Sequence, residues 1–217
     1  MVLGIYGSGG SGRDLFSLIL QEGKDRCWDE VVFIDDTKPE GIMMEIKMMP
    51  FELFCRRYPA ENAKIMIALG EPEYRKMIFQ RVHEKGYALA TYIHDSVKIS
   101  KFAEVAEGAV ILDDVFVSPM VKIGTNVWIN GYSIIGHDVQ IGDHCQISSH
   151  VIVTGNTVVS DCVYIGAGAS IRERISIGEF AVISMGAVVL KSVRPEMIAM
   201  GNPAREIAVN EKHRVFE

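Results

Sequence analysis

Aliphatic side chains recur at a fixed interval along more than a third of the chain. From Ile99 to Val189, every sixth residue is isoleucine or valine, with no break in phase. A second column of mostly small residues lies two positions before each of these aliphatic residues. Glycine, serine or asparagine often directly follows the aliphatic residue. A period of six fits neither an α-helix nor a simple strand. It predicts a parallel β-helix made of hexapeptide repeats.

The repeat also predicts which residues stack. Each hexad supplies one short strand and one corner, and the aliphatic and small columns both point inward because strand side chains alternate between faces. Three hexads close a triangular coil, so residues n and n+18 lie one above the other, about 4.8 Å apart.

The first part of the chain has a different pattern, in which apolar strand segments alternate with helical segments. We predict strands at 2–6, 31–34 and 64–69, and helices at 13–21, 51–57 and 73–85. This alternation predicts a small α/β, Rossmann-like parallel sheet. The expected organisation is residues 1–93 as a Rossmann-like domain, 94–190 as the β-helix and 191–217 as a C-terminal loop and tail.

Three polar segments follow the carboxyl ends of the predicted strands. In a parallel sheet these ends lie at the same edge, so the three segments are expected to converge on one ligand site. They are Gly7–Gly12, Asp35-Asp36 and Gly70. The first segment matches the G-x-G-x-x-G dinucleotide fingerprint. However, a domain of about ninety residues is long enough for only one of the two mononucleotide-binding halves of a dinucleotide-binding fold. Three interpretations remain open: a nucleotide-linked substrate bound by backbone N–H groups, a nicotinamide cofactor, or glycines that only form a tight turn.

His137 is the strongest candidate for acid–base chemistry in the β-helix. Asp138 follows it and can orient an imidazole or stabilise its charged form. Gly155 lies eighteen positions on, which places a backbone N–H beside the imidazole. A base next to a free N–H donor is what acyl transfer requires. The alternative is that His137 is an ordinary solvated side chain.

Composition and charge exclude several classes of function. The net charge of −6 and pI near 5.6 argue against nucleic-acid and anionic-membrane partners. No apolar run approaches the ~20 residues that span a bilayer, and the start lacks a basic signal-peptide region. Four cysteines without C-x-x-C spacing are typical of a reducing, cytoplasmic compartment. His137, His144 and His150 do not stack at coil spacing, so no metal site is expected.

The chain resembles bacterial sugar O- and N-acyltransferases that join a Rossmann-like domain to a left-handed β-helix. They include nucleotide-4-amino-sugar N-acetyltransferases and the NeuD type of sialic acid O-acetyltransferase. The matching stretches are Gly7–Gly12, 34–36, 67–70 with Arg75, 93–94, 136–138 and Gly201–Arg205.

This resemblance implies an acetyl-CoA-dependent N-acetyltransferase acting on a nucleotide-linked amino sugar, a 4-amino-4,6-dideoxy sugar, in a homotrimer that serves surface-polysaccharide biosynthesis. His137 would be the general base, Asp138 its support, and Gly155 the donor to the thioester carbonyl. The implied acetyl-CoA contacts are Gly155, Ala167, Met185, Gly201, Pro203 and Arg205. The implied nucleotide-sugar contacts are Ser8, Gly9, Gly10, Ser11, Asp35, Asp36, Gly70 and Arg75.

One departure from the family pattern keeps the nucleophile open. Many members have Gly-Gly-His-Gly where this chain has serine at position 11, and that histidine is associated with the sugar amino group. A sugar O-acetyltransferase, acting on sialic acid or another sugar, is therefore one alternative. A non-catalytic nucleotide-sugar-binding protein is an alternative from another class. His94 is interpreted as structural, because Asp95 replaces the proline that follows it in relatives.

Overall fold

The computed structural model describes residues 1–216 of the chain. They form two compact units, which are treated separately below. The first unit comprises Met1–Gly70 and Met77–Thr91, and the second comprises Glu71–Lys76 and the chain from Tyr92 onward. The boundary lies beside the expected one at residue 93, and the predicted C-terminal tail groups with the β-helix.

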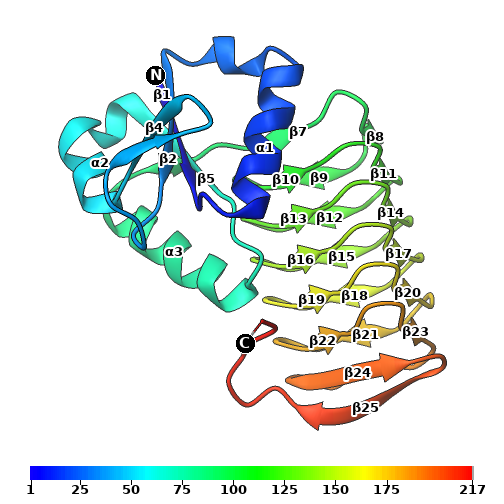
Figure 1. The fold of residues 1–217 in the computed structure, drawn as a ribbon. Coiled ribbons are helices and arrows are strands. Elements are labelled where there is room, and N and C mark those ends of the chain that lie inside the picture. The colour runs from blue at the N-terminus through cyan, green and yellow to red at the C-terminus, as the bar shows by residue number, and fades with distance from the viewer. Residues whose placement is uncertain (217) are drawn as a thin grey trace. The chain divides into compact units, whose positions relative to one another are not determined.

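The first unit is a six-stranded sheet, sheet A, with strand order β3-β4-β2-β1-β5-β6 (Figure 1). Its strands are β1 (Val2–Tyr6), β2 (Glu30–Ile34), β3 (Gly41–Met43), β4 (Ile46–Met49), β5 (Ala63–Ile67) and β6 (Ala88–Leu89). Its helices are α1 (Gly10–Gln21), the 3-10 helix η1 (Lys24–Cys27), α2 (Phe51–Arg57), the 3-10 helix η2 (Ala60–Asn62) and the later part of α3 (Pro72–Glu84). All pairs are parallel except the β3–β4 hairpin.

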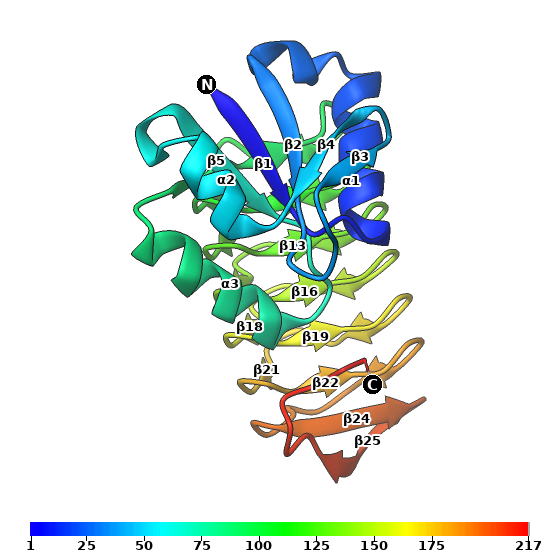
Figure 2. The same ribbon diagram turned by 60° about the vertical axis from the view of Figure 1, so that its left-hand side comes forward.

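Strand β1 lies inside sheet A, between β2 and β5. All five of its residues are buried, as a strand in the middle of a parallel sheet requires. Figure 2 shows the helices of this unit beside the sheet. The β3–β4 hairpin was not predicted: its strands are short, and its turn residues Met44 and Glu45 have positive φ without the usual glycine or asparagine.

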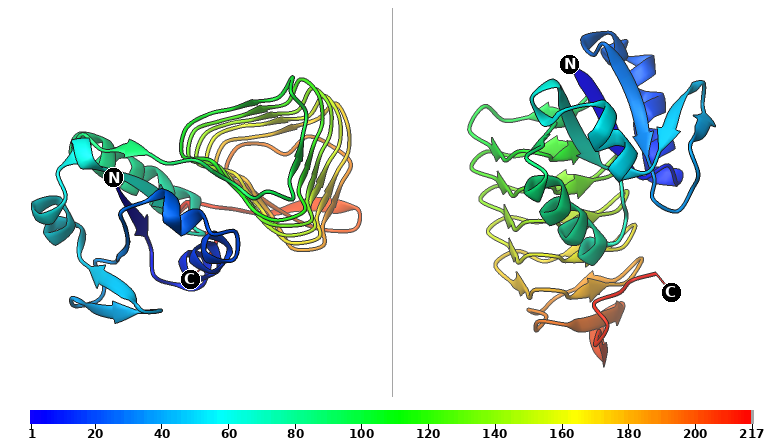
Figure 3. Two further views of the ribbon diagram at one scale, coloured as in Figure 1. Left: turned by 90° about the horizontal axis from the view of Figure 1, so that it is seen from above. Right: turned by 90° about the vertical axis from the view of Figure 1, so that its left-hand side faces the viewer.

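The second unit is a β-helix with three sheets, seen along its axis as a triangle in Figure 3. Sheet B contains β7 (Tyr92–Ile93), β10 (Val110–Ile111), β13 (Trp128–Ile129), β16 (Gln146–Ile147), β19 (Tyr164–Ile165), β22 (Val182–Ile183), β24 (Met197–Gly201) and β25 (Ala204–Val209). Sheet C contains β8 (Lys98–Ile99), β11 (Phe116–Val117), β14 (Ile134–Ile135), β17 (Ile152–Val153), β20 (Ser170–Ile171) and β23 (Val188–Val189). Sheet D contains β9 (Glu104–Val105), β12 (Lys122–Ile123), β15 (Gln140–Ile141), β18 (Val158–Val159) and β21 (Ser176–Ile177).

The predicted inward columns form the core of this unit. Ile135, Val153 and Ile171 are stacked by the parallel register of sheet C, and each is almost fully buried. The small column is buried with them, including Cys145 and Ala169. The predicted fold class, an α/β domain followed by a hexapeptide-repeat β-helix, is confirmed.

Most corners between the sheets bend through one residue in the left-handed region. Asn126, Asp138, Asn156 and Arg174 have φ between 55° and 59°. Asparagine and aspartate tolerate this conformation best among residues other than glycine. Below, the C–D corner means the turns that join sheet C to sheet D, and the B–C corner means the turns that join sheet B to sheet C.

The C-terminal segment differs from the predicted loop. Strands β24 and β25 form an antiparallel hairpin, and β24 continues sheet B by pairing with β22. The hexad period ends at Val189, so the repeat carried no signal for these strands. The hairpin adds two strands to the last coil of the β-helix.

Candidate active site

His137 and Asp138 occupy the C–D corner between β14 and β15, after Gly136. Their side chains are 63% and 51% exposed. The imidazole Nδ1 lies 2.8 Å from Oδ2 of Asp138. Because a carboxylate only accepts hydrogen bonds, Nδ1 donates the proton, and Nε2 carries the free lone pair. The pair therefore presents a basic nitrogen to solvent, and the carboxylate stabilises the imidazolium that forms when this nitrogen takes up a proton.

Gly155 lies directly below His137, as the eighteen-residue repeat predicts. The backbone N–H of Asn156 donates to the carbonyl oxygen of His137 at 2.9 Å, which fixes this register. A Cβ atom on Gly155 would lie only 2.6 Å from Cε1 and Nε2 of His137. The imidazole therefore packs against the bare Cα of Gly155, and any side chain there would displace it.

The Gly155 N–H is an available donor. No acceptor among residues 1–216 receives it, whereas the corresponding N–H groups of Thr125 and Asp143, at the corner between sheets D and B, donate to aspartate side chains at 2.7 and 2.8 Å. A Cβ on Gly136 would lie 2.8 Å from the Gly155 nitrogen, so this N–H is next to the turn that carries His137. The C–D corner thus combines a base with an uncommitted hydrogen-bond donor.

The other residues predicted to contact acetyl-CoA gather at the B–C corner. The Gly186 N–H donates to the carbonyl oxygen of Ala167 at 2.8 Å, which stacks the turn containing Met185 below Ala167. Met185 is 78% exposed. The predicted loop from Gly201 to Arg205 contains the turn between β24 and β25, and β24 extends sheet B toward the same corner. Within one chain, the predicted acetyl-CoA residues therefore divide between the two corners that flank sheet C.

In the first unit, the glycine-rich loop joins β1 to α1. Gly7 has φ +109°, and a Cβ on Gly12 would lie 1.9 Å from the carbonyl oxygen of Gly7, so both positions require glycine. By contrast, a Cβ on Gly9 or Gly10 would meet no atom within 4 Å. Gly9 is the N-cap of α1 and supplies no side-chain cap. The first N–H groups of α1 are therefore uncovered, an arrangement suited to a phosphate.

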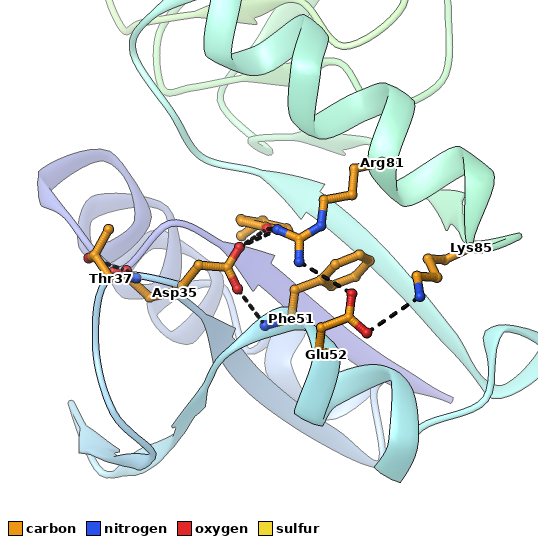
Figure 4. Close-up of polar contacts among 8 residues, drawn as sticks. Asp35, Thr37, Phe51, Glu52, Arg81 and Lys85 are labelled. Carbon is orange, nitrogen blue, oxygen red and sulfur yellow. Dashed lines mark hydrogen bonds and ion pairs between the residues drawn. The ribbon is translucent and has the colours of Figure 1, made fainter.

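Asp35 holds this loop from the end of β2. Its Oδ2 accepts hydrogen bonds from the buried Ser8 hydroxyl and backbone N–H. Its Oδ1 accepts from Thr37 N and Oγ1 at 3.0 and 2.6 Å (Figure 4). Lys38 Nζ lies 3.3 Å from Oδ2 and 2.6 Å from the Ser8 hydroxyl. Burial alone would raise the pKa of Asp35, but these hydrogen bonds outweigh burial and lower the pKa to about 2. Asp35 is therefore ionised and committed to its own loop.

Asp36 joins three elements of the first unit. It accepts hydrogen bonds from the Tyr6 hydroxyl, from the Phe51 backbone N–H at 2.9 Å and from Arg81 at 2.5 Å. Arg81 also contacts Glu52, which pairs in turn with Lys85 of α3 (Figure 4). Burial opposes ionisation of Asp36, but these donors prevail and lower its pKa. Both carboxylates of the predicted acidic pair therefore accept hydrogen bonds from the first unit itself, although Asp36 remains partly exposed. The loop backbone stays open for a ligand, with Lys38 beside it.

Arg75 is placed differently from its predicted role in substrate binding. Its side chain is fully buried, and it groups with the second unit. The guanidinium donates to the Asn126 carbonyl oxygen through Nε at 3.1 Å and to the Asn126 side-chain oxygen at 2.7 Å, and lies 5.7 Å from the Trp128 ring. It is therefore a structural contact between the first turn of α3 and the β-helix. The helical pattern could not reveal this role, because Asn126 lies in another part of the sequence.

His144 lies in the same buried group of side chains as Arg75 and Asn126. The Asn126 side-chain amide donates to Nδ1 of His144 at 3.1 Å and to the Arg75 carbonyl oxygen at 3.1 Å. Burial lowers the pKa of His144, nearby Asp143 and Asp161 oppose this shift, and Arg75 and Lys76 reinforce it. The folded protein therefore holds His144 neutral, so that Nδ1 can accept from Asn126.

We expect this histidine to make stability depend on pH. A group whose pKa is depressed in the folded state contributes stability that is present above its unfolded pKa, about 6.5 for histidine, and is lost as the pH falls. Chemical denaturation at pH 7.5 and 5.5 should show a larger loss for the natural chain than for His144→Gln, which keeps an acceptor but does not titrate. Equal losses in both proteins would contradict this assignment.

No cluster of three or more His, Cys, Asp or Glu side chains within residues 1–216 could hold a metal ion. Over the same range, no helix is long and apolar enough to cross a membrane.

Family models match both units of the chain. The PglD N-terminal domain matches residues 2–82, and the bacterial transferase hexapeptide (six repeats) matches residues 120–155. The chain is 30% identical over 139 residues to the GDP-perosamine N-acetyltransferase of Escherichia coli O157:H7. That alignment covers 63% of this chain and 62% of the relative, so it spans less than two thirds of the relative's length.

Solved structures match almost the whole chain. The acetyltransferase domain of PglB from Neisseria gonorrhoeae FA1090, in complex with acetyl coenzyme A, is 26% identical with a TM-score of 0.87, covering 95% of this chain and 98% of that one. WeeI from Acinetobacter baumannii AYE is 28% identical with a TM-score of 0.89, covering 95% of this chain and 100% of that one. Both units and their order along the chain are therefore shared with these proteins.

Proposed function

We propose that the chain is a sugar acyltransferase of the type that joins a PglD N-terminal domain to hexapeptide repeats, and that it is an acetyl-CoA-dependent N-acetyltransferase of a nucleotide-linked amino sugar. The observation that carries the proposal is the His137–Asp138 pair packed against Gly155, whose N–H meets no acceptor in residues 1–216. The relatives support the two substrates, since one is a GDP-perosamine N-acetyltransferase and another binds acetyl coenzyme A.

The proposed reaction is direct transfer in a ternary complex. The sugar amino nitrogen attacks the thioester carbonyl carbon, forming the C–N bond, while His137 Nε2 takes the proton that the nitrogen loses. The carbonyl oxygen becomes negative, and the Gly155 N–H donates to it. Collapse of the tetrahedral intermediate breaks the C–S bond, and the imidazolium returns its proton to the departing CoA sulfur. Asp138 keeps Nδ1 protonated and stabilises the charge that develops on the ring.

The first unit is the proposed nucleotide-sugar site. The uncovered N–H groups from Gly9 to Ser11 suit a diphosphate, and Lys38 adds a positive charge beside them. Gly70, which follows β5, is partly exposed and stays in the proposed site. Asp35 and Asp36 shape the loop through Ser8, Tyr6 and Arg81. Asp35 is almost buried, whereas the Asp36 carboxylate is partly exposed and could accept a further hydrogen bond from a ligand.

Sugar O-acetylation is the second candidate. Serine at position 11 supports it, because a serine hydroxyl cannot take up a proton as the histidine of many relatives can. The same His137 would then deprotonate a sugar hydroxyl. The two candidates share the catalytic corner and differ only in the acceptor.

A homotrimer is part of the proposal, since it would bring the two groups of acetyl-CoA residues together. His137 and Gly155 lie at the C–D corner, whereas Ala167 and Met185 lie at the B–C corner. Sheet C, between these corners, exposes an apolar column: Phe116, Ile134 and Ile152 are 45%, 43% and 39% exposed. The equivalent column on sheet D begins with Glu104, Lys122 and Gln140. Packing sheet C against a second copy would place a C–D corner near a B–C corner of its neighbour.

We expect Ile134→Asp to dissociate this assembly. A charge in the centre of the apolar column would lose its water on association, which is costly without a partner. Light scattering coupled to size exclusion should show trimers for the natural chain and for Lys122→Ala, a matched change on sheet D, but monomers for Ile134→Asp. A trimeric Ile134→Asp protein, or a natural chain that is monomeric, would argue against this interface.

A panel assay tests the proposed activity and identifies the acceptor. Acetyl-CoA is offered with nucleotide-linked 4-amino sugars, sialic acids and plain nucleotide sugars, and both thiol release and product mass are measured. We expect the fastest acetylation on a nucleotide-linked amino sugar. Acetylation of sialic acid alone would favour the O-acetyl alternative, and tight nucleotide-sugar binding without thiol release would favour a non-catalytic binding protein.

We also place the protein in the cytoplasm, in surface-polysaccharide biosynthesis. The four cysteines are free thiols in the structure, which suits a reducing compartment. An amino sugar linked to a nucleotide is an activated donor for glycan assembly, so its acetylation would precede transfer of the sugar.

A further inference from the structure

The residues after the β24–β25 hairpin turn back along the β-helix (Figure 1). Residues 210–216 are called here the C-terminal strap. Asn210, which is 6% exposed, fixes its start. The Asn210 backbone N–H donates to the Glu196 carbonyl oxygen at 2.6 Å, and its side-chain amide donates to the Phe180 carbonyl oxygen at 3.1 Å. The strap therefore starts from a point that is held on the last coils of the β-helix.

Aromatic contacts hold the rest of the strap against earlier coils. The His213 imidazole stacks on the Phe180 ring with 3.8 Å between centroids, and its Nε2 lies 2.7 Å from the Glu196 carboxylate. The Phe216 ring packs edge-on against Tyr164 of β19, with 5.4 Å between centroids. Because β22 lies between β19 and β24 in sheet B, the strap runs back across the end of this sheet.

The end of the strap binds the carboxylate of Glu71. The Val215 N–H lies 2.9 and 3.0 Å from the two carboxylate oxygens, and the Phe216 N–H donates to Oε2 at 3.0 Å. Glu71 is only 5% exposed, and no cation among residues 1–216 lies within ion-pair distance of it. A buried charge is costly unless hydrogen bonds replace the water that it loses. The strap supplies these hydrogen bonds to Glu71.

Glu71 connects the strap to the chain at the end of β5. Its backbone carbonyl oxygen accepts the first hydrogen bond of α3, from the Arg75 N–H at 2.9 Å. It directly follows Gly70, so the two Cα atoms are about 3.8 Å apart. A change in the position of Glu71 therefore also moves Gly70, which the proposed function places in the nucleotide-sugar site.

The residues before Gly70 pack against the glycine-rich loop. The Ala68 N–H donates to the Tyr6 carbonyl oxygen at 2.8 Å, at the end of the paired strands β1 and β5. A Cβ on Gly7 would lie 2.7 Å from the Ala68 carbonyl oxygen and 2.9 Å from the Leu69 side chain. Because this contact is so close, a shift of residues 68–70 also shifts the start of the loop.

We infer that Glu71 is a positioning residue for nucleotide-sugar binding and that the C-terminal strap holds it in place. The inference rests on the proposed function, which puts Gly70 and the glycine-rich loop at the nucleotide-sugar site. Glu71 acts without touching the ligand, because its anchored carboxylate sets the backbone that the ligand meets. His137 lies at the C–D corner, whereas the strap packs on sheet B, so binding of coenzyme A should not depend on this contact.

Two variants, one on each side of the contact, test this inference by titration calorimetry. Glu71→Gln replaces one acceptor oxygen by a donor NH2 group, and Val215→Pro removes the N–H that reaches both oxygens. Glu211→Gln, an exposed glutamate of the strap, is the matched control. GDP and UDP are the probes of the first unit, and coenzyme A is the probe of the β-helix. We expect the Kd of the nucleotide that binds the natural chain to rise about tenfold in both variants. The Kd of coenzyme A, and both Kd values in the control, should be unchanged.

Hydrogen exchange measures the contact itself, without a ligand. The amides of the strap and of residues 68–75 should exchange faster in both variants than in the natural chain, because the contact holds both segments. Combining Glu71→Gln with Val215→Pro should weaken nucleotide binding no more than either change alone, since both remove the same contact.

The binding data separate failure of this inference from failure of the proposed function. Equal nucleotide Kd values in the natural chain and both variants overturn the inference and leave the proposed function intact. Equal losses for the nucleotide and coenzyme A show that Glu71 only supports the fold, which also overturns it. If Glu71→Gln does not fold, Val215→Pro decides. If neither nucleotide binds the natural chain, the proposed sugar site is wrong, and the inference is wrong with it.

Discussion

His137→Ala should lower kcat for sugar acetylation by at least ~100-fold, since general-base catalysis typically contributes 10²- to 10⁴-fold. The imidazole is mostly exposed and packs only on the Cα of Gly155, so the fold and its melting temperature should change little. KM for acetyl-CoA should change little, because the base acts on the nucleophile. The measurement is steady-state thiol release on the acceptor that the panel identifies, with His83→Ala, an exposed histidine of α3, as the matched control.

A second variant, at Asp138, tests the contribution of the carboxylate apart from that of the base His137. Asp138→Asn keeps a side chain of the same size but removes the charge that stabilises the imidazolium. We expect kcat to fall by less than in His137→Ala. If His137→Ala retained nearly the full turnover on the true acceptor, the assignment of the base would be wrong.

Gly155→Ala should lower kcat by about 100-fold, because a catalytic group displaced by about an ångström commonly costs that much. The new methyl group would lie 2.6 Å from two ring atoms of His137, so the imidazole must swing away from the Gly155 N–H. The backbone donor itself stays in place. The variant therefore tests the juxtaposition of the two groups and not only the presence of each.

The control for this substitution is Gly41→Ala, where a Cβ meets no atom within 4 Å. Gly41→Ala should leave kcat unchanged. If Gly155→Ala were as active as the natural chain, the packing of His137 on Gly155 would have no catalytic role. Combining His137→Ala with Gly155→Ala should add little to His137→Ala alone, because the alanine at 155 then displaces nothing.

The periodic part of the fold was predictable because its determinants are local and repeated. The pattern of each hexad identifies the residues that point inward. The eighteen-residue length of a coil is then enough to predict that His137 lies beside Gly155. The same repeat predicts that Gly155 and Ala167 lie at different corners, because they are twelve residues, or two hexads, apart. The division of the predicted acetyl-CoA residues between two corners was therefore already contained in the repeat.

The parts that could not be predicted depend on contacts between distant segments. Arg75 fits a helical pattern, but its guanidinium is held by Asn126, a partner that only the folded chain brings near. The contacts of Asp36 with Tyr6 and Arg81 likewise cannot be inferred from the local sequence. In the same way, Lys38 joins the glycine-rich loop only through its contacts with Ser8 and Asp35.

A crystal structure with coenzyme A and the nucleotide-linked amino sugar tests the central claim most directly. The account predicts the sugar amino nitrogen at hydrogen-bond distance from His137 Nε2, with the coenzyme sulfur close to the Gly155 N–H at the C–D corner. A coenzyme whose sulfur lies at another corner, or a sugar amino group out of reach of His137, would contradict it.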